Sequence, residues 1–336
     1  MIDFDLTTQP VAPPPDDGLI YPGSGASKAG ASRLAAANHC DRWFAYRHGL
    51  LAFRGGSVAQ AGGALVHAGV AQHYARLGAA QPDGIVVSGK HVNTPSQLGT
   101  IEQAIDREAA LRGLPPGSEQ EVDARSCTEQ YIAHYRRDSF RILHVEEEYA
   151  ATIPCKVHHV TVLAAQRHAL NPAGVVVASG GVEGSPEATV TLEFSGYLWT
   201  TRTDLVVSTG SKVFIADHKT TGRIEAKHPR VYALTGQMAG LRWLGQQVYG
   251  ERFGGVILNM IQRDAPYKFE RPNMDAGPAL SRDFPQHVRD TEARIEALAA
   301  RCIPFGQWPT ASSELVCYHR YGRCPAADAC LWGSSP

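Results

Sequence analysis

The stretch TRTDLVVSTGSKVFIADHKT, residues 201–220, contains two β-strand patterns joined by a tight turn. β-branched residues recur in both runs, and Gly210 with Ser211 supplies the turn between them. If the turn is centred between these two residues, counting seven residues outward in each direction places Asp204 opposite Asp217. The run VFIA before Asp217 is apolar at successive positions, which predicts a buried central strand rather than an edge strand.

This hairpin brings together groups that suit a divalent cation. Cross-strand neighbours have Cβ atoms about 5 Å apart, a separation at which two carboxylates can share one cation. Asp217 and Lys219 are two residues apart, so their side chains leave the same face of the strand. Burying these charges costs several kcal/mol unless a metal or partner charges compensate. The pattern therefore predicts a metal site beside an ammonium group, which can activate water and stabilise charge on a phosphate. The alternative is a solvated ion pair on an exposed strand.

The pattern of elements around the hairpin favours an α/β fold on a small mixed sheet flanked by helices. Helical patterns cover residues 32–50, with Ser32 as N-cap, and 62–77, 96–111, 121–138, 231–248 and 287–302. Strand patterns outside the hairpin cover residues 141–153, 188–200 and 254–261, with a Gly/Pro/Ser-rich insertion at 171–187.

The chain divides into three parts by composition. Residues 1–30 are rich in Pro, Gly and Ser, which predicts a flexible tail. Residues 31–310 form one domain that includes the N-terminal helices, and residues 311–336 form a cysteine-rich C-terminal segment.

Composition limits the classes of function. The chain has 336 residues, of which 43% are hydrophobic, enough for a sizeable core. Its formal net charge of −1 provides no general attraction for phosphates or membranes, which argues against a protein that coats DNA non-specifically. No signal sequence and no apolar run of membrane-spanning length is found, so we expect a cytoplasmic location without a membrane partner.

Together with one residue upstream and one downstream, the hairpin residues resemble the site of the PD-(D/E)XK nuclease superfamily, specifically its RecB-like and Cas4-like branch. The resemblance implies a restriction-endonuclease-like core. The matching residues are His67 in GGALVHAGV, Asp204 in TRTDLVV, Asp217 and Lys219 in IADHKTTG, and Gln237 in TGQMAGL. Two positions depart from the family pattern: Thr201 stands where glycine is usual, and Leu241 stands where tyrosine is usual.

The resemblance implies a catalytic site and a metal site that share residues. The implied catalytic residues are Asp204, Asp217, Lys219 and Gln237, with Lys219 positioning or deprotonating the attacking water. The implied ligands of Mg²⁺ or Mn²⁺ are His67, Asp204, Asp217 and the main-chain carbonyl of His218. A histidine ligand beside oxygen donors would favour Mn²⁺ somewhat more than an all-oxygen site would.

Two further residues have alternative interpretations. His67 by itself would be read as a helix histidine satisfied in the core. Glu146 in HVEEEYA matches an acid often found before the family's first long strand, but three consecutive glutamates could equally form one solvated face.

Seven cysteines without a secretory signal favour thiols or metal ligands over disulfides. Three of them, Cys317, Cys324 and Cys330, lie in CYHRYGRCPAADAC, and Cys40 lies far upstream in NHCDRWFAYR. Four thiolates can bind Zn²⁺ or an iron–sulfur cluster, and the spacing does not separate the two. The split resembles the iron–sulfur members of the same branch, which implies a [4Fe–4S] cluster that ties the chain ends together, although Asp41 replaces a usual proline. The remaining cysteines are expected to be small apolar residues: Cys127, Cys155 and Cys302.

The expected substrate is DNA, as single strands or duplex ends. Basic and aromatic residues interleave at 42–54, 131–141 and 222–237, which suits contacts with backbone and bases, or else core aromatics and solvated arginines. No phosphate-binding P-loop motif is present, so any helicase would be a separate protein. The leading hypothesis is a metal-dependent exonuclease in DNA repair, recombination or phage- or CRISPR-related processing. The alternatives are a non-catalytic DNA-end-binding or adaptor subunit of a recombination or adaptation complex, and a zinc-stabilised structural protein.

Overall fold

The computed structural model describes residues 30–41, 44, 58–164, 167–170, 176–179, 190–272, 278–301, 318–319 and 322–323. Its α-helices are α1 Ala31–His39, α3 Val58–Ala79, α4 Ile101–Leu111, α5 Glu119–His134, α6 His228–Ala233, α7 Gly236–Tyr249 and α8 Pro278–Ala299. Two 3₁₀ turns are η2 Pro95–Gln97 and η4 Gly250–Arg252. Within the described ranges, no helix combines the length and apolar character needed to cross a membrane.

One mixed sheet organises the fold. Its strands are β1 Ile85–Val87, β2 Lys90–Val92, β3 Arg141–Ala164, β4 Arg167–Leu170, β5 Val176–Ser179, β6 Val190–Thr209, β7 Lys212–Thr221, β8 Phe253–Gln262 and β9 Lys268–Glu270. They are hydrogen-bonded in the order β2-β1-β3-β6-β7-β8-β9, and β5 joins β3 to β4. A separate two-stranded pair is β10 Tyr318–His319 with β11 Gly322–Arg323. The mixed α/β class expected from the sequence is therefore confirmed.

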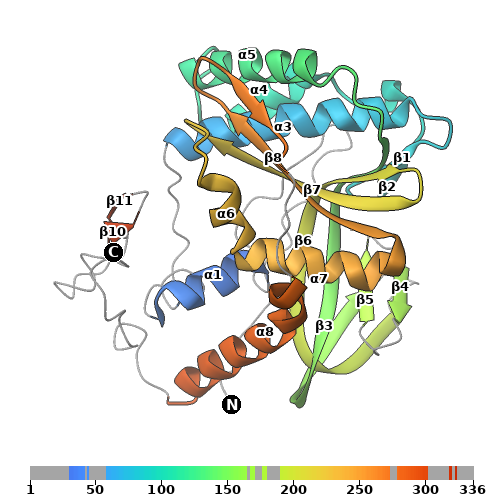
Figure 1. The fold of residues 1–336 in the computed structure, drawn as a ribbon, viewed down its shortest axis with the longest axis vertical. Helices are drawn as coiled ribbons and strands as arrows, with labels where there is room; N and C mark the ends of the chain where they lie inside the picture. Colours follow the sequence, from blue (N-terminus) through green and yellow to red (C-terminus); the bar gives the residue numbers. More distant parts are fainter. Residues whose placement is uncertain are drawn as a thin grey trace.

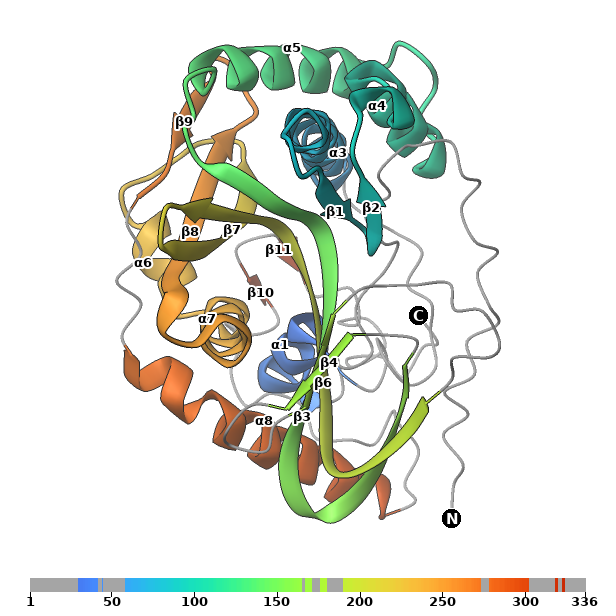
Figure 2. The same cartoon turned by 90° about the vertical axis from the view of Figure 1, so that its right-hand side faces the viewer.

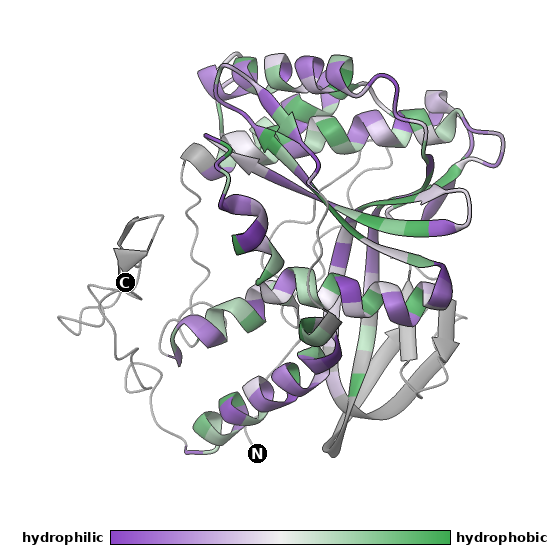
Figure 3. Cartoon of the chain, viewed as in Figure 1, coloured by the Kyte–Doolittle hydropathy of each residue, from purple (hydrophilic) through white to green (hydrophobic). Residues whose placement is uncertain are grey.

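Helices cover both faces of the sheet, as Figures 1 and 2 show: α3, α4 and α5 lie on one side, and α1, α6, α7 and α8 lie on the other. Bands of hydrophilic and hydrophobic residues alternate along α5 and α8 (Figure 3), as expected for helices with one face toward solvent and the other toward the core. The first layer buries a cluster that includes Leu65, Val70 and Ile105, and the second buries Trp199 against Trp243.

The hairpin has the predicted register. Strand β6 ends at Thr209 and β7 begins at Lys212, so Gly210 and Ser211 form the turn, and Gly210 takes a φ of +65°. The pairs run from Thr209 with Lys212 to Leu205 with Ala216. Strand β7 lies between β6 and β8, which confirms that it is a central strand.

Some boundaries differ from the sequence prediction. Residues 231–248 do not form one helix, because α6 ends at Ala233 and α7 begins at Gly236, where the Thr235 hydroxyl accepts a hydrogen bond from the Met238 amide. At the first helix, Gly30 rather than Ser32 is the N-cap. Residues 96–100 lie outside α4, which is capped by Thr100. The predicted insertion at 171–187 contains strand β5 among its described residues.

Candidate metal centre

Two acidic residues meet where strands β3 and β6 run side by side. The pairs Val145 with Leu205 and Glu147 with Thr203 leave Glu146 and Asp204 facing each other between them. Glu146 has a φ of +53°, an uncommon backbone conformation for a residue with a Cβ, and its side chain is 0% exposed. Because local strain of this kind is kept where the surroundings fix it, and often at functional sites, the conformation marks Glu146 for attention.

The third acid lies on the next strand. The last pair of the β6–β7 ladder is Leu205 with Ala216, so Asp217 is the next residue across from Asp204. At this point the main-chain N–H of His218 donates a 2.6 Å hydrogen bond to Oδ2 of Asp204. The register therefore aligns Glu146, Asp204 and Asp217 on three adjacent strands.

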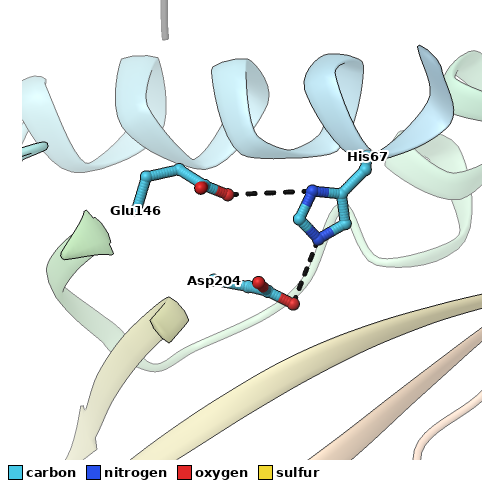
Figure 4. Close-up of side chains that lie close together, drawn as sticks. All are labelled: His67, Glu146 and Asp204. Carbon is cyan, nitrogen blue, oxygen red and sulfur yellow. Dashed lines mark ion pairs between the residues drawn. The ribbon is translucent and has the colours of Figure 1, made fainter. Parts of the chain in front are cut away.

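Helix α3 adds a histidine to this row. Nε2 of His67 lies 3.0 Å from Oδ2 of Asp204, and Nδ1 lies 3.7 Å from Oε1 of Glu146, so the ring stands between two carboxylates (Figure 4). One donor atom from each of the three residues fits within 4.8 Å of the others. The His67 side chain is 20% exposed and contacts two acids, so it is not a histidine satisfied in the apolar core.

Lys219 and Gln237 contact Asp217. Nζ of Lys219 lies 2.5 Å from Oδ2 of Asp217, and Nε2 of Gln237 donates a 2.8 Å hydrogen bond to Oδ1. Asp217 is 2% exposed, which excludes the alternative of a solvated pair on an exposed strand. The break before α7 explains the position of Gln237, because it starts a new helix at Gly236 and places Gln237 in its first turn.

The site holds protons tightly in the absence of a cation. Burial alone would lower the pKa of His67, but Asp204 and Glu146 outweigh it and raise that pKa to about 9. Burial raises the pKa of Glu146 to about 7, against the opposing effects of Arg202 and His67. Burial likewise raises the pKa of Asp217 to about 6, although Lys219 opposes the shift.

Two other groups in the site keep their charge. Burial disfavours the Asp204 carboxylate, but His67 outweighs burial and the pKa of Asp204 is lowered. Burial also disfavours the Lys219 ammonium, but Asp217 and Asp204 outweigh it and raise the pKa of Lys219.

The donor set fits a divalent cation. Arg202 Nε lies 2.8 Å from Oε2 of Glu146, yet neither carboxylate oxygen of Glu146 accepts a well-oriented hydrogen bond from the described residues. Oδ2 of Asp217 likewise has a close cationic neighbour, Lys219, but accepts no well-oriented hydrogen bond from the described residues. Buried carboxylate oxygens normally accept hydrogen bonds, so these oxygens are suited to bind a cation instead. Carboxylates with one imidazole are ligands that Mg²⁺ and Mn²⁺ accept.

Glu146 is the residue for which sequence reasoning was least decisive. Glu146 and Glu147 are both buried, so the three glutamates do not form one solvated face. The sequence signal was the match to an acid that the family often has before its first long strand, whereas Glu146 lies within β3. Its unusual φ and its register against Asp204 could not be read from residue types.

Other predicted sites are only partly described. Cys40 directly follows α1 and is half-buried, whereas Cys317, Cys324 and Cys330 lie outside the described residues, as does most of the basic and aromatic stretch 42–54. In the stretch 131–141, Tyr131 is buried and Tyr135 and Phe140 pack against the core, so these aromatic residues have a structural role.

Comparison with protein-family models gives a match over most of the chain. The family model of the PD-(D/E)XK nuclease superfamily matches residues 28–331. No curated protein matches the chain. The matched range contains the hairpin, His67 and Gln237, and it spans nearly all of the 336 residues. The chain therefore belongs to the PD-(D/E)XK nuclease superfamily, whose members share a metal-dependent nuclease-type fold.

Proposed function

We propose that this chain is a metal-dependent deoxyribonuclease that hydrolyses phosphodiester bonds at DNA ends. The observation that carries the proposal is the contact of Lys219 with Asp217 beside the cluster of His67, Glu146 and Asp204. A site kept only for structure would be better served by apolar residues, because buried charges of this kind contribute little net stability.

His67, Glu146, Asp204 and Asp217 would hold Mg²⁺ or Mn²⁺, together with the carbonyl of His218 that the family resemblance implies. A bound cation would supply Lewis-acid polarisation of the scissile phosphate and a lower pKa for the attacking water. The protein must first release protons from His67 and Glu146, whose pKa values are raised to about 9 and about 7.

Lys219 would act on the reacting phosphate and water. Its raised pKa keeps the ammonium charged, so it is suited to orient the attacking water and to offset the negative charge that develops on the phosphate. Gln237 donates to Oδ1 of Asp217 and thereby fixes the carboxylate that holds Lys219. We assign Gln237 to positioning and Lys219 to catalysis.

DNA would approach along the segment that follows the catalytic strand. In the segment between β7 and α7, Arg223, Lys227 and Arg230 are exposed, four to eleven residues after Lys219. Glu225 neutralises Lys227 through a 2.7 Å ion pair, which leaves Arg223 and Arg230 as the better candidates for phosphate contacts. The resemblance to the RecB-like and Cas4-like branch is the basis for proposing that the chain acts on DNA ends, as an exonuclease.

We further propose that Cys40, Cys317, Cys324 and Cys330 bind a [4Fe–4S] cluster. Helix α8 is the last described helix before the three C-terminal cysteines. Its Ile295 and Leu298 share one buried cluster with Ala36 and Ala37 of α1 and with Phe44. Arg294 also donates a 2.8 Å hydrogen bond to the carbonyl of Ala37. The chain therefore leaves α8 near the helix that Cys40 follows, which supports a cluster shared by the two ends.

The test is hydrolysis of 5′- and 3′-labelled single-stranded and duplex DNA by anaerobically purified protein with Mn²⁺ or Mg²⁺. We expect metal-dependent release of nucleotides by the wild type and none by Asp217→Ala. Binding of DNA ends without hydrolysis would instead support the non-catalytic subunit of a recombination or adaptation complex. Full activity of Asp217→Ala would rule out the site.

A further inference from the structure

The side chain of His218 links the metal centre to the opposite side of β7. His218 lies between Asp217 and Lys219, so its side chain leaves the other face of the strand, and it is 4% exposed. Its ring stacks on Tyr74 of α3, with centroids 6.0 Å apart. The same ring meets His67 edge-on, with centroids 5.5 Å apart. The residue between the acid and the lysine therefore supports the helix that carries His67.

Asn259 holds this ring from the neighbouring strand. His218 pairs with Asn259 in the β7–β8 register, and Nδ2 of Asn259 lies 2.7 Å from Nδ1 of His218. Oδ1 of Asn259 accepts a 3.1 Å hydrogen bond from Nε of Arg271. Because a guanidinium only donates, this contact identifies the oxygen of the amide and turns Nδ2 toward His218. His218 Nδ1 must then accept this hydrogen bond, so the neutral ring carries its proton on Nε2.

Arg271 is held in turn by an ion pair and two phenols. Its Nη1 donates to both carboxylate oxygens of Asp138, at 2.9 and 2.8 Å. Its Nη2 donates to the hydroxyls of Tyr74 at 2.5 Å and Tyr131 at 2.9 Å. The guanidinium carbon lies 3.5 Å from the centroid of the Tyr135 ring. A planar cation with this many partners has little freedom to turn.

On its other side, the chain of contacts ends at a metal donor. The main-chain N–H of His218 donates to Oδ2 of Asp204, the same oxygen that faces Nε2 of His67. Moving the His218 ring would therefore disturb both Asp204, through the peptide group, and His67, through the ring contact.

We propose that Asn259, clamped by Arg271, is a positioning residue for the metal centre. It fixes His218 so that the peptide N–H holds Asp204 and the ring supports His67. This inference rests on the proposed function, because it assigns to a second set of buried residues the geometry of the same site. Residues that orient metal ligands in this way typically change metal affinity 10–100-fold when they are removed.

The test is Mn²⁺ binding to the metal-free full-length protein, measured by calorimetry, in Asn259→Leu, His218→Leu and the double variant. His218→Leu keeps the peptide N–H and removes only the ring. We expect each single variant to weaken Mn²⁺ binding about 10–100-fold and the double variant to be no weaker than the worse single variant, because both changes break one link. DNA hydrolysis at saturating Mn²⁺ gives a second readout, in which we expect the KM for DNA to be unchanged.

Matched controls separate positioning from general stability. Asn38→Leu removes an amide that contacts another histidine: Asn38 Nδ2 lies 2.9 Å from Nε2 of His287. Arg33→Gln removes another bidentate arginine–carboxylate contact, in which Arg33 donates to Glu292 at 2.8 and 2.7 Å. Both should bind Mn²⁺ like the wild type. Arg271→Lys keeps a charge beside Asp138 but loses the planar fork, and should weaken Mn²⁺ binding even if Asn259→Leu fails to fold.

Wild-type affinity in the folded Asn259→Leu or Arg271→Lys protein would overturn the inference, as would additive losses in the double variant. The proposed function fails by a different result. A wild type that binds Mn²⁺ and does not cut DNA would reject the nuclease, whereas the Mn²⁺ titrations would still decide the role of Asn259. A wild type without Mn²⁺ binding would reject both.

Discussion

Nζ of Lys219 lies 2.5 Å from Oδ2 of Asp217, on a strand that is buried in the middle of the sheet. Lys219→Met retains the length of the side chain and removes its charge. We expect the rate of DNA hydrolysis to fall more than about 100-fold at saturating Mn²⁺, because the group proposed to offset charge on the phosphate is lost. Lys219 also opposes the rise in the pKa of Asp217, so the assay should be made at pH 8.5, well above the pKa of about 6 that Asp217 has in the wild type.

Lys212→Met is the control for this substitution. Lys212 begins the same strand, is exposed, and donates a 2.9 Å hydrogen bond to the carbonyl of Glu251. It should keep wild-type activity. If Lys219→Met hydrolysed DNA as fast as Lys212→Met, Lys219 would have no catalytic role.

Glu146→Gln tests whether the buried acid of β3 belongs to the metal centre. The amide has nearly the same shape but no charge, so we expect Mn²⁺ affinity to fall at least about tenfold. In the metal-free protein at pH 8 the substitution removes a buried carboxylate whose ionisation is costly, so the melting temperature should not fall. Glu148→Gln, at an exposed position two residues later, provides the control. Equal Mn²⁺ affinities in the two variants would exclude Glu146 as a ligand.

The sequence predicted the central part of this site because the hairpin obeys local rules. A two-residue turn with glycine fixes the register, and the register fixes which residue faces Asp204. The role of Glu146 needed tertiary information, since its positive φ and its position opposite Asp204 depend on how β3 pairs with β6.

The position of Gln237 shows a different limit of prediction. Residues 231–248 have a helical pattern throughout, and the Thr235 side chain caps the start of α7 where the structure separates it from α6. Threonine is neutral inside a helix and favourable at its start, so the residue type permits both readings. The position of Asn259 on β8 could not be foreseen either, because its pairing with His218 joins residues 41 apart in the chain.

Stability of the metal-free protein should decrease as pH rises from about 6 to about 9. The folded-state pKa of His67 is raised from 6.5 to about 9, so its stabilising effect is present below pH 6.5 and is lost as pH approaches 9. Glu146 and Asp217, raised to about 7 and about 6, bind more protons in the folded state and also favour folding at lower pH.

The measurement is thermal melting from pH 6 to 9 with EDTA and with excess Mn²⁺. A cation takes the place of the protons, so the difference between the two melting temperatures should widen as pH rises. In His67→Gln this widening should be smaller. A difference that is independent of pH in the wild type would show that these groups do not exchange protons for the metal.

Cys40→Ser tests the iron–sulfur cluster separately from the nuclease site. If the proposed cluster forms, we expect the variant, purified anaerobically, to lack iron and sulfide and to melt at a lower temperature, because a proposed ligand that joins the two ends of the chain is removed. Mn²⁺ affinity should change little, since the candidate donors His67, Glu146 and Asp204 lie on α3, β3 and β6, and the further proposed donor Asp217 lies on β7. Cys127→Ala, at a buried position in α5, should retain iron. Zinc without iron in the wild type would identify a zinc site instead.

The close approach of α3 to β7 gives the sharpest test of how the fold positions His67. A Cβ added at Gly63, one turn before His67, would lie 2.5 Å from Oγ1 of Thr220, which directly follows Lys219. Gly63→Ala should therefore push the helix from the strand, cost about 1–3 kcal/mol of stability, and weaken Mn²⁺ binding.

The second substitution, Thr220→Ala, removes the atom that would clash. The remaining Cβ of residue 220 lies 3.5 Å from the added methyl group, an ordinary contact, so the double variant should regain both stability and Mn²⁺ affinity. Thr220→Ala by itself should bind Mn²⁺ like the wild type, because the Thr220 side chain is not among the metal donors. Recovery of stability without recovery of affinity would show that the spacing of α3 and β7 does not set the position of His67. Recovery of both would show that a glycine on the helix and a small side chain on the strand together determine where the histidine meets Asp204.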